Sequence, residues 1–107
     1  MTAEEFRTAA LRMPDAVEAA HMNHPDFRVN GRIFASLGYP DDGWGMVKLT
    51  PAQQQSFMKK APGMFAPCAG AWGKRGATSV HLGSAKKRIL GKALVVAAQN
   101  MINSTKP

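Results

Sequence analysis

The sequence predicts an α+β domain in which an antiparallel sheet carries helices on one face. Three observations predict this class: capping patterns open helices at Thr2 and Thr50, an Asn-Gly turn joins two apolar strands at residues 30–31, and a helical apolar stripe runs through residues 85–102. Domains usually hold about 100–150 residues. The 107 residues are therefore expected to form one domain, residues 1–107.

Three helices are expected, each with its own start signal. The first begins after Thr2, whose hydroxyl and the carboxylate of Glu5 can each accept a free backbone N–H, and it ends before Pro14. The second covers residues 51–61. The last is expected over residues 85–102 with Ser84 as its N-cap.

The hairpin at residues 30–31 is the clearest local signal. Both turn positions need positive φ, which Asn and Gly tolerate, so a two-residue turn follows. The expected cross-strand pairs are Phe27 with Phe34, Arg28 with Ile33, and Val29 with Arg32.

Further strands extend this hairpin into a sheet. Residues 44–49 are expected to return as a third strand, and residues 19–22 fit a short edge strand. Residues 65–72 and 77–82 are expected to form another hairpin around the tip at residues 73–76, Gly-Lys-Arg-Gly. Without the edge strand, the resulting order is α-β-β-β-α-β-β-α.

Charge is unevenly distributed along the chain. Residues 1–42 hold all seven acids and four arginines, a net charge of −3. Residues 43–107 hold ten lysines and arginines and no acid, so the whole chain has a net charge of +7. Such an excess attracts polyanions, of which nucleic acid is the commonest, although many small domains are basic for solubility alone.

Three basic clusters lie in the acid-free region. One opens the last helix, where the helix dipole is already positive and free N–H groups point outward, an arrangement that suits an anion; alternatively, these exposed side chains simply extend into water. The others are a lysine pair near the end of the second helix and the basic hairpin tip. With the two arginines of the first hairpin, the candidate phosphate contacts are Lys59, Lys60, Lys74, Arg75, Lys86, Lys87, Arg88, Lys92, Arg28 and Arg32.

No catalytic or metal-binding motif stands out. His21, His24 and Asp26 have a spacing that suits metal ligands, but zinc sites usually need three or four ligands and no paired cysteines occur. Cys68 and His81 would form a nucleophilic pair only if neighbouring strands brought them together. We therefore expect no enzyme activity, no metal and no cofactor.

The two tryptophans could serve either of two roles, binding or core packing. Trp44 and Trp72 can stack on nucleic acid bases, but only eight aromatic residues occur and the core needs most of them, which favours burial. A deep pocket reaching either of them, His81 or Cys68 would instead indicate a small-molecule site.

The expected cellular compartment of the protein follows from signals that the sequence lacks. The longest apolar run, residues 93–98, is far shorter than the roughly 18 residues that suggest a membrane span. The single cysteine cannot form an internal disulfide, and Glu4 and Glu5 stand where a secretion signal carries positive charge. A cytoplasmic protein with no membrane partner is expected.

Three stretches together resemble the signature of the MmcQ/YjbR family of small bacterial proteins. They are residues 24–35 (HPDFRVNGRIFA), 43–51 (GWGMVKLTP) and 70–78 (GAWGKRGAT). The resemblance implies a two-layer α-β(3)-α-β(2)-α fold, similar to that of type III secretion chaperones. It also implies DNA binding through paired β wings, which would correspond to the hairpins at residues 30–31 and 73–76, and it brings no catalytic residue or cofactor.

Two functions follow as expectations. The first is non-enzymatic binding of double-stranded DNA through phosphate contacts, with weak sequence preference because no helix carries an obvious set of base-reading side chains. The second is a protein-interaction module, acting as a homodimer or with another protein, that binds its partner along an exposed sheet edge.

Overall fold

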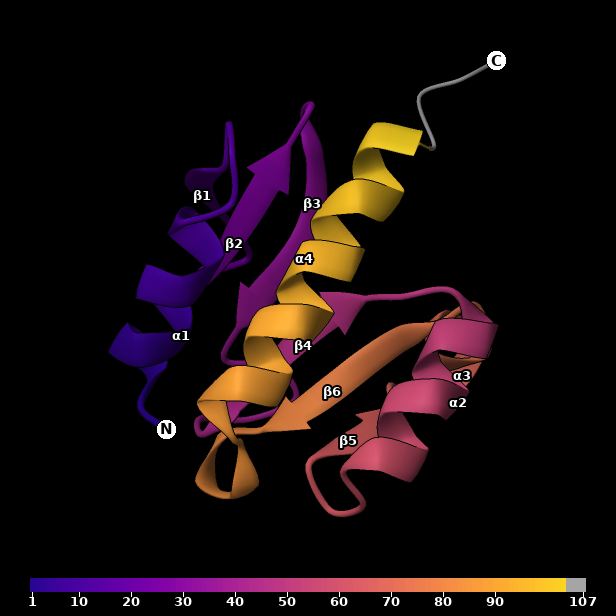
Figure 1. Ribbon diagram of the computed structural model, residues 1–107. Coiled ribbons are helices and arrows are strands. Elements are labelled where there is room, and N and C mark those ends of the chain that lie inside the picture. Colours follow the sequence, from indigo (N-terminus) through magenta and orange to yellow (C-terminus); the bar gives the residue numbers. More distant parts are fainter. Residues whose placement is uncertain (104–107) are drawn as a thin grey trace.

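A six-stranded antiparallel sheet runs through the molecule in the order β1-β2-β3-β4-β6-β5 (Figure 1). The computed structural model describes residues 1–103. The strands are β1 (Val17–His21), β2 (His24–Val29), β3 (Arg32–Leu37), β4 (Trp44–Lys48), β5 (Phe65–Pro67) and β6 (Ala77–His81). The helices are α1 (Ala3–Leu11), α2 (Pro51–Lys60), α3 (Gly70–Lys74) and α4 (Lys87–Asn103), with a 3₁₀ turn η1 (Leu82–Ser84).

This architecture confirms the predicted α+β class. The expected edge strand is present as β1, and α3 is a helix that the predicted order lacks. Helices α1, α2 and α4 cover one face of the sheet, and α4 crosses its centre (Figure 1). No helix within residues 1–103 is both long and apolar enough to cross a membrane.

Both predicted capping boxes are confirmed. The Thr2 hydroxyl accepts the Glu5 N–H at 3.1 Å, and the Glu5 carboxylate accepts the Thr2 N–H at 2.9 Å. Thr50 and Gln53 repeat this exchange at the start of α2. These reciprocal bonds satisfy donors that a helix start leaves free, which fixes where both helices begin.

The hairpin at residues 30–31 is confirmed, but its register shifts partway along. Asn30 and Gly31 have φ values of 61° and 74°, and the two pairs nearest the turn form as expected. Phe27 then pairs with Ala35 rather than Phe34, because a β-bulge adds one residue to β3. The extra residue allows Phe34 and Ala35 both to be completely buried.

The strands expected on either side of residues 73–76 do pair, as β5 with β6, but the tip predicted between them is wrong. Strand β5 ends at Pro67, which has no N–H to donate, and α3 begins at Gly70 with a φ of 72°. The buried amide of Gln54 in α2 also lies 3.0 Å from the carbonyl oxygen of Gly73, fixing the end of this short helix. The basic residues of the expected tip therefore lie at the C-terminal end of α3.

The predicted N-cap of the last helix is also wrong. Ser84 belongs to η1, and its hydroxyl lies 2.8 Å from Nδ1 of His81, so α4 begins three residues later at Lys87.

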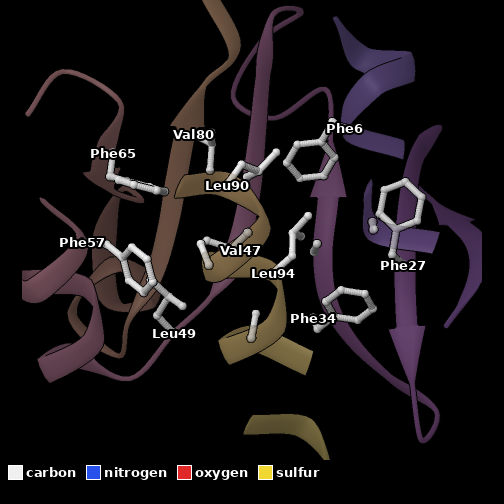
Figure 2. Close-up of a cluster of buried hydrophobic side chains, with 14 of the residues drawn as sticks. Phe6, Phe27, Phe34, Val47, Leu49, Phe57, Phe65, Val80, Leu90 and Leu94 are labelled. Carbon is white, nitrogen blue, oxygen red and sulfur yellow. The ribbon is translucent and has the colours of Figure 1, made fainter. Parts of the chain in front are cut away.

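The main core lies between the sheet and its covering helices (Figure 2). Leu90 and Leu94 of α4 are completely buried, and so are Val47 of β4 and Val80 of β6. Gly45 is required where the Phe6 ring of α1 reaches β4, because a Cβ there would lie 2.8 Å from that ring. Alternate residues of β4 thus reach the core, and the others face the side of the sheet that carries no α4.

Candidate functional site

The ten cations proposed from the sequence fall at three separate places. Arg28 and Arg32 belong to the β2–β3 hairpin, and Lys74 and Arg75 lie at the C-terminal end of α3. The others lie at the end of α2 and the beginning of α4. We call this last group the basic end: Lys59, Lys60, Lys86, Lys87, Arg88 and Lys92.

The basic end is assembled by the pairing of β5 with β6. Strand β5 follows α2 and β6 precedes α4, and the N–H of His81 donates to the carbonyl oxygen of Met64 at 2.9 Å. The C-terminal end of α2 and the N-terminal end of α4 consequently lie at the same end of the molecule, the lower end in Figure 1. All six cations are exposed, and Arg88 and Lys92 stand one helical turn apart.

One cation of the basic end has an acidic partner. Nζ of Lys87 lies 2.5 Å from the Glu5 carboxylate of α1. This hydrogen bond, together with the one from the Thr2 N–H, lowers the pKa of Glu5 to about 2. Among residues 1–103, no carboxylate lies within ion-pair distance of the other five cations.

Arg28 is committed to a buried carboxylate. Its Nε and Nη2 donate to Asp26 at 2.8 and 3.1 Å, and the Asp26 side chain is completely buried. The bonds from Arg28 lower the pKa of Asp26, against the effect of burial, and a contact from His21 adds to them. Arg28 therefore compensates an internal charge rather than presenting a free guanidinium.

The pair at the end of α3 is exposed, but its flanking glycines are not. A Cβ on Gly73 would lie 1.8 Å from the carbonyl oxygen of Cys68, and one on Gly76 would lie 1.9 Å from that of Leu49. Both glycines thus permit close packing of backbone against backbone. They do not form the open tip of a β wing, which corrects the expectation for Lys74 and Arg75.

A groove on the face of the sheet opposite α4 was missed by the sequence reasoning. Its volume is 480 Å³ and its lining is mainly apolar. We call it the sheet groove; its lining residues are His21, Met22, His24, Ile33, Ser36, Tyr39, Met46, Lys48, Ala69, Trp72 and Cys68. The residues come from five strands and helices or the loops between them, so no local sequence pattern reveals them. The only available signals were two of the residues suggested for a small-molecule pocket, Cys68 and Trp72.

Trp72 is not part of the core, contrary to the favoured expectation. It is 56% exposed in α3, and Nζ of Lys48 lies 5.3 Å from its ring centroid. Trp44 is half-buried, with its ring centroid 4.8 Å from that of His81. Only Trp72 therefore belongs to the sheet groove.

The suggested metal and nucleophile clusters have other arrangements. Nδ1 of His21 lies 2.7 Å from Asp26, whereas His24 packs edge-on against Tyr39. Within residues 1–103, no three His, Cys, Asp or Glu side chains come together as ligands for a metal.

The possible nucleophilic pair is not assembled either. Sγ of Cys68 lies 3.3 Å from the Ser79 hydroxyl, and the Cys68 N–H donates to Ala77, four residues from His81 along β6. Burial raises the pKa of the Cys68 thiol, and this disfavours the reactive thiolate.

Comparisons with known proteins address the fold and the family. A solved structure, that of the Deinococcus radiodurans protein DR2400 with a DUF419 domain, is similar with a TM-score of 0.80 and 18% sequence identity. The match covers 99% of this chain and 82% of that chain, and it shows a shared fold. No curated protein matches the sequence. The YjbR family model matches residues 11–97, most of the helices and strands described above, and the chain therefore belongs to the YjbR family.

Proposed function

We propose that the protein is a cytoplasmic, non-catalytic DNA-binding protein that contacts the phosphate backbone of the duplex through the basic end. The observation that carries the proposal is that the C-terminal end of α2 and the N-terminal end of α4 both lie at the lower end of the molecule in Figure 1, and that the cations at both helix ends are exposed. Phosphate contacts from lysine and arginine supply most of the affinity of such binding.

The α4 terminus adds to this attraction. Its first turn has free backbone N–H groups and no acidic side chain, so the helix dipole reinforces the charges of Lys87 and Arg88. The Glu5 carboxylate opposes this, because it neutralises part of the charge on Lys87. We therefore count five effective cations at the basic end: Lys59, Lys60, Lys86, Arg88 and Lys92.

Sequence preference is expected to be weak. The side chains of the basic end are five lysines and one arginine, which hold phosphates, and this set contains no amide of the kind that reads base edges. If all five cations contact phosphates, log K should fall with log salt with a slope of about −4.5.

Fluorescence anisotropy with a labelled duplex tests the proposal. The double variant Lys59→Glu/Lys60→Glu should weaken binding at least tenfold and flatten the salt slope by about 2. Lys74→Glu/Arg75→Glu is the matched control, since it changes the net charge equally at the end of α3. Equal losses in both variants would show a response to overall charge and overturn the site, and binding independent of salt would overturn the function.

The free edge of β1 favours a second candidate, protein interaction by strand addition. Strand β1 pairs on one side with β2 and forms one edge of the sheet, and Val17 on it is 57% exposed. An extended peptide can add a strand to such an edge. Proline at residue 20 would block this pairing, because in the β1–β2 register the N–H of Ala20 points away from β2. A partner recovered after nuclease treatment by the wild type and not by Ala20→Pro would support this function. The folded state of the variant should be checked by circular dichroism.

A further inference from the structure

Exposed apolar side chains concentrate around the sheet groove. Seven large hydrophobic residues are well exposed within the described chain, and three of them, Met22, Tyr39 and Trp72, line this one groove. Tyr39 and Trp72 are 52% and 56% exposed. Aromatic surface left in water around a concave site is typical of a ligand-binding position.

The groove runs along β4 between these aromatic residues. Tyr39 lies near the start of β4, because the N–H of Gly38 donates to the carbonyl oxygen of Trp44 at 2.9 Å. Trp72 lies at the other end of the strand, against Lys48. Met46, which is 5% exposed, forms part of the floor between them.

The charge of the groove has one sign. Its lining contains the ammonium group of Lys48 and no carboxylate. Asp26, which neighbours the groove through His21, is completely buried and is bonded to Arg28. No carboxylate within residues 1–103 is in ion-pair distance of Lys48, so its charge is available to a ligand.

Lys48 is also held in place. Its carbonyl oxygen accepts a hydrogen bond of 3.1 Å from Nδ2 of Asn100 in α4, which fixes the end of β4. Its side chain is half-buried, with the ammonium group over the Trp72 ring. A flat apolar group beside Trp72 could therefore carry a carboxylate to within reach of Nζ.

We propose that the sheet groove binds a small aromatic carboxylate. The aromatic body packs along β4 between Tyr39 and Trp72, and the carboxylate pairs with Lys48. The volume of 480 Å³ lies within the range of about 300–1,000 Å³ that small-molecule sites occupy. This site is separate from the basic end, so the inference does not depend on DNA binding.

Naphthoate, with naphthalenemethanol as its neutral analogue, provides a direct test. Two-dimensional NMR follows the indole N–H of Trp72, which the variant Trp44→Phe identifies. Naphthoate is expected to shift this signal with a Kd in the range of roughly 0.1–1 mM, as befits a ligand of this size. The alcohol should bind about fivefold more weakly, since it lacks the charge that pairs with Lys48.

Two methionine variants assign the charge preference to one residue. Lys48→Met keeps an apolar stem over Trp72 but lacks the ammonium group. In this variant the ratio of the Kd of the alcohol to the Kd of naphthoate should fall from about 5 to about 1. Lys59→Met at the basic end removes an equal charge and should leave the ratio unchanged. If Lys48→Met does not fold, Lys48→Gln serves the same comparison.

Each other result would overturn the proposal. If the Kd ratio stays at about 5 in Lys48→Met, the ion pair with Lys48 is excluded. If the indole N–H signal of Trp72 does not shift at about 10 mM naphthoate, the site is excluded. Shifts confined to the basic end would show that naphthoate responds only to exposed cations. Displacement of naphthoate by a short oligothymidylate of higher affinity would assign the groove to single-stranded nucleic acid instead.

Discussion

The ammonium group of Lys87, at the start of α4, lies 2.5 Å from the carboxylate of Glu5 in the first turn of α1. The two residues are far apart in the sequence, and their contact joins the first helix to the last. The same carboxylate accepts the Thr2 N–H, so one acidic group both caps α1 and neutralises a cation of the basic end.

This contact predicts a loss of stability in acid. Hydrogen bonds lower the pKa of Glu5 from its ordinary 4.5 to about 2 in the folded chain, so the unfolded chain binds more protons between these values. The stabilisation is present above pH 4.5 and is lost as the pH falls toward 2. Thermal unfolding should show a smaller decrease in Tm over this range for Glu5→Gln, which keeps the capping box, than for the wild type. An equal decrease in both proteins would contradict the assignment.

Removal of Arg28 should destabilise the sheet. Arg28→Met leaves the buried Asp26 carboxylate without its two guanidinium bonds, at an expected cost of about 2–3 kcal/mol in the free energy of unfolding. Urea denaturation measures this cost. Arg12→Met, an exposed arginine after α1, should change stability by less than about 0.5 kcal/mol. Similar effects of both substitutions would contradict a special role for the Arg28 pair.

Two glycines should respond in opposite directions to alanine. Gly45→Ala places a Cβ 2.8 Å from the buried Phe6 ring, which cannot easily move, and should destabilise the fold by about 1–3 kcal/mol. Gly91→Ala in α4 meets nothing within 4 Å and should stabilise the helix by up to about 1 kcal/mol. Chemical denaturation of the two variants distinguishes them, and the same sign for both would show that α1 packs differently against β4.

Leucine substitutions at two neighbouring glutamines of α2 should differ in their effect on stability. The Nε2 group of Gln54 lies within 3.1 Å of the carbonyl oxygens of Gly73 and Ala77, and the side chain is buried. Gln54→Leu should cost about 2 kcal/mol, because these acceptors lose their donor. Gln55→Leu, at an exposed position, should have little effect on stability. Hydrogen exchange of the α3 amides, faster in Gln54→Leu alone, would link the loss to this contact.

The sequence predicts those parts of the fold that depend on neighbouring residues. Capping boxes and the Asn30-Gly31 turn involve residues at most three positions apart, and both are confirmed. The register of the hairpin was wrong only beyond the bulge, where burial of Phe34 and Ala35 together outweighs regular pairing.

The candidate site depends on contacts between distant residues. Helix α3 replaces the end of the strand expected over residues 65–72, and its position depends on Gln54, almost twenty residues earlier, which bonds to Gly73. The sheet groove requires Tyr39, Lys48 and Trp72 to come together from separate elements. Neither the strand pattern nor the composition could indicate that Trp72 faces outward, since its exposure is set by the position of α3.

Alternate side chains of β4 face opposite sides of the sheet, and they differ in how readily they can be substituted. Val47 is completely buried in the core that α4 covers, whereas its neighbours Met46 and Lys48 face the sheet groove. Met46 is almost fully buried, but Lys48 is only half-buried, so a substitution at Lys48 can alter what the surface recognises without repacking the interior. A chain built this way can acquire a new binding preference one residue at a time while its scaffold remains intact.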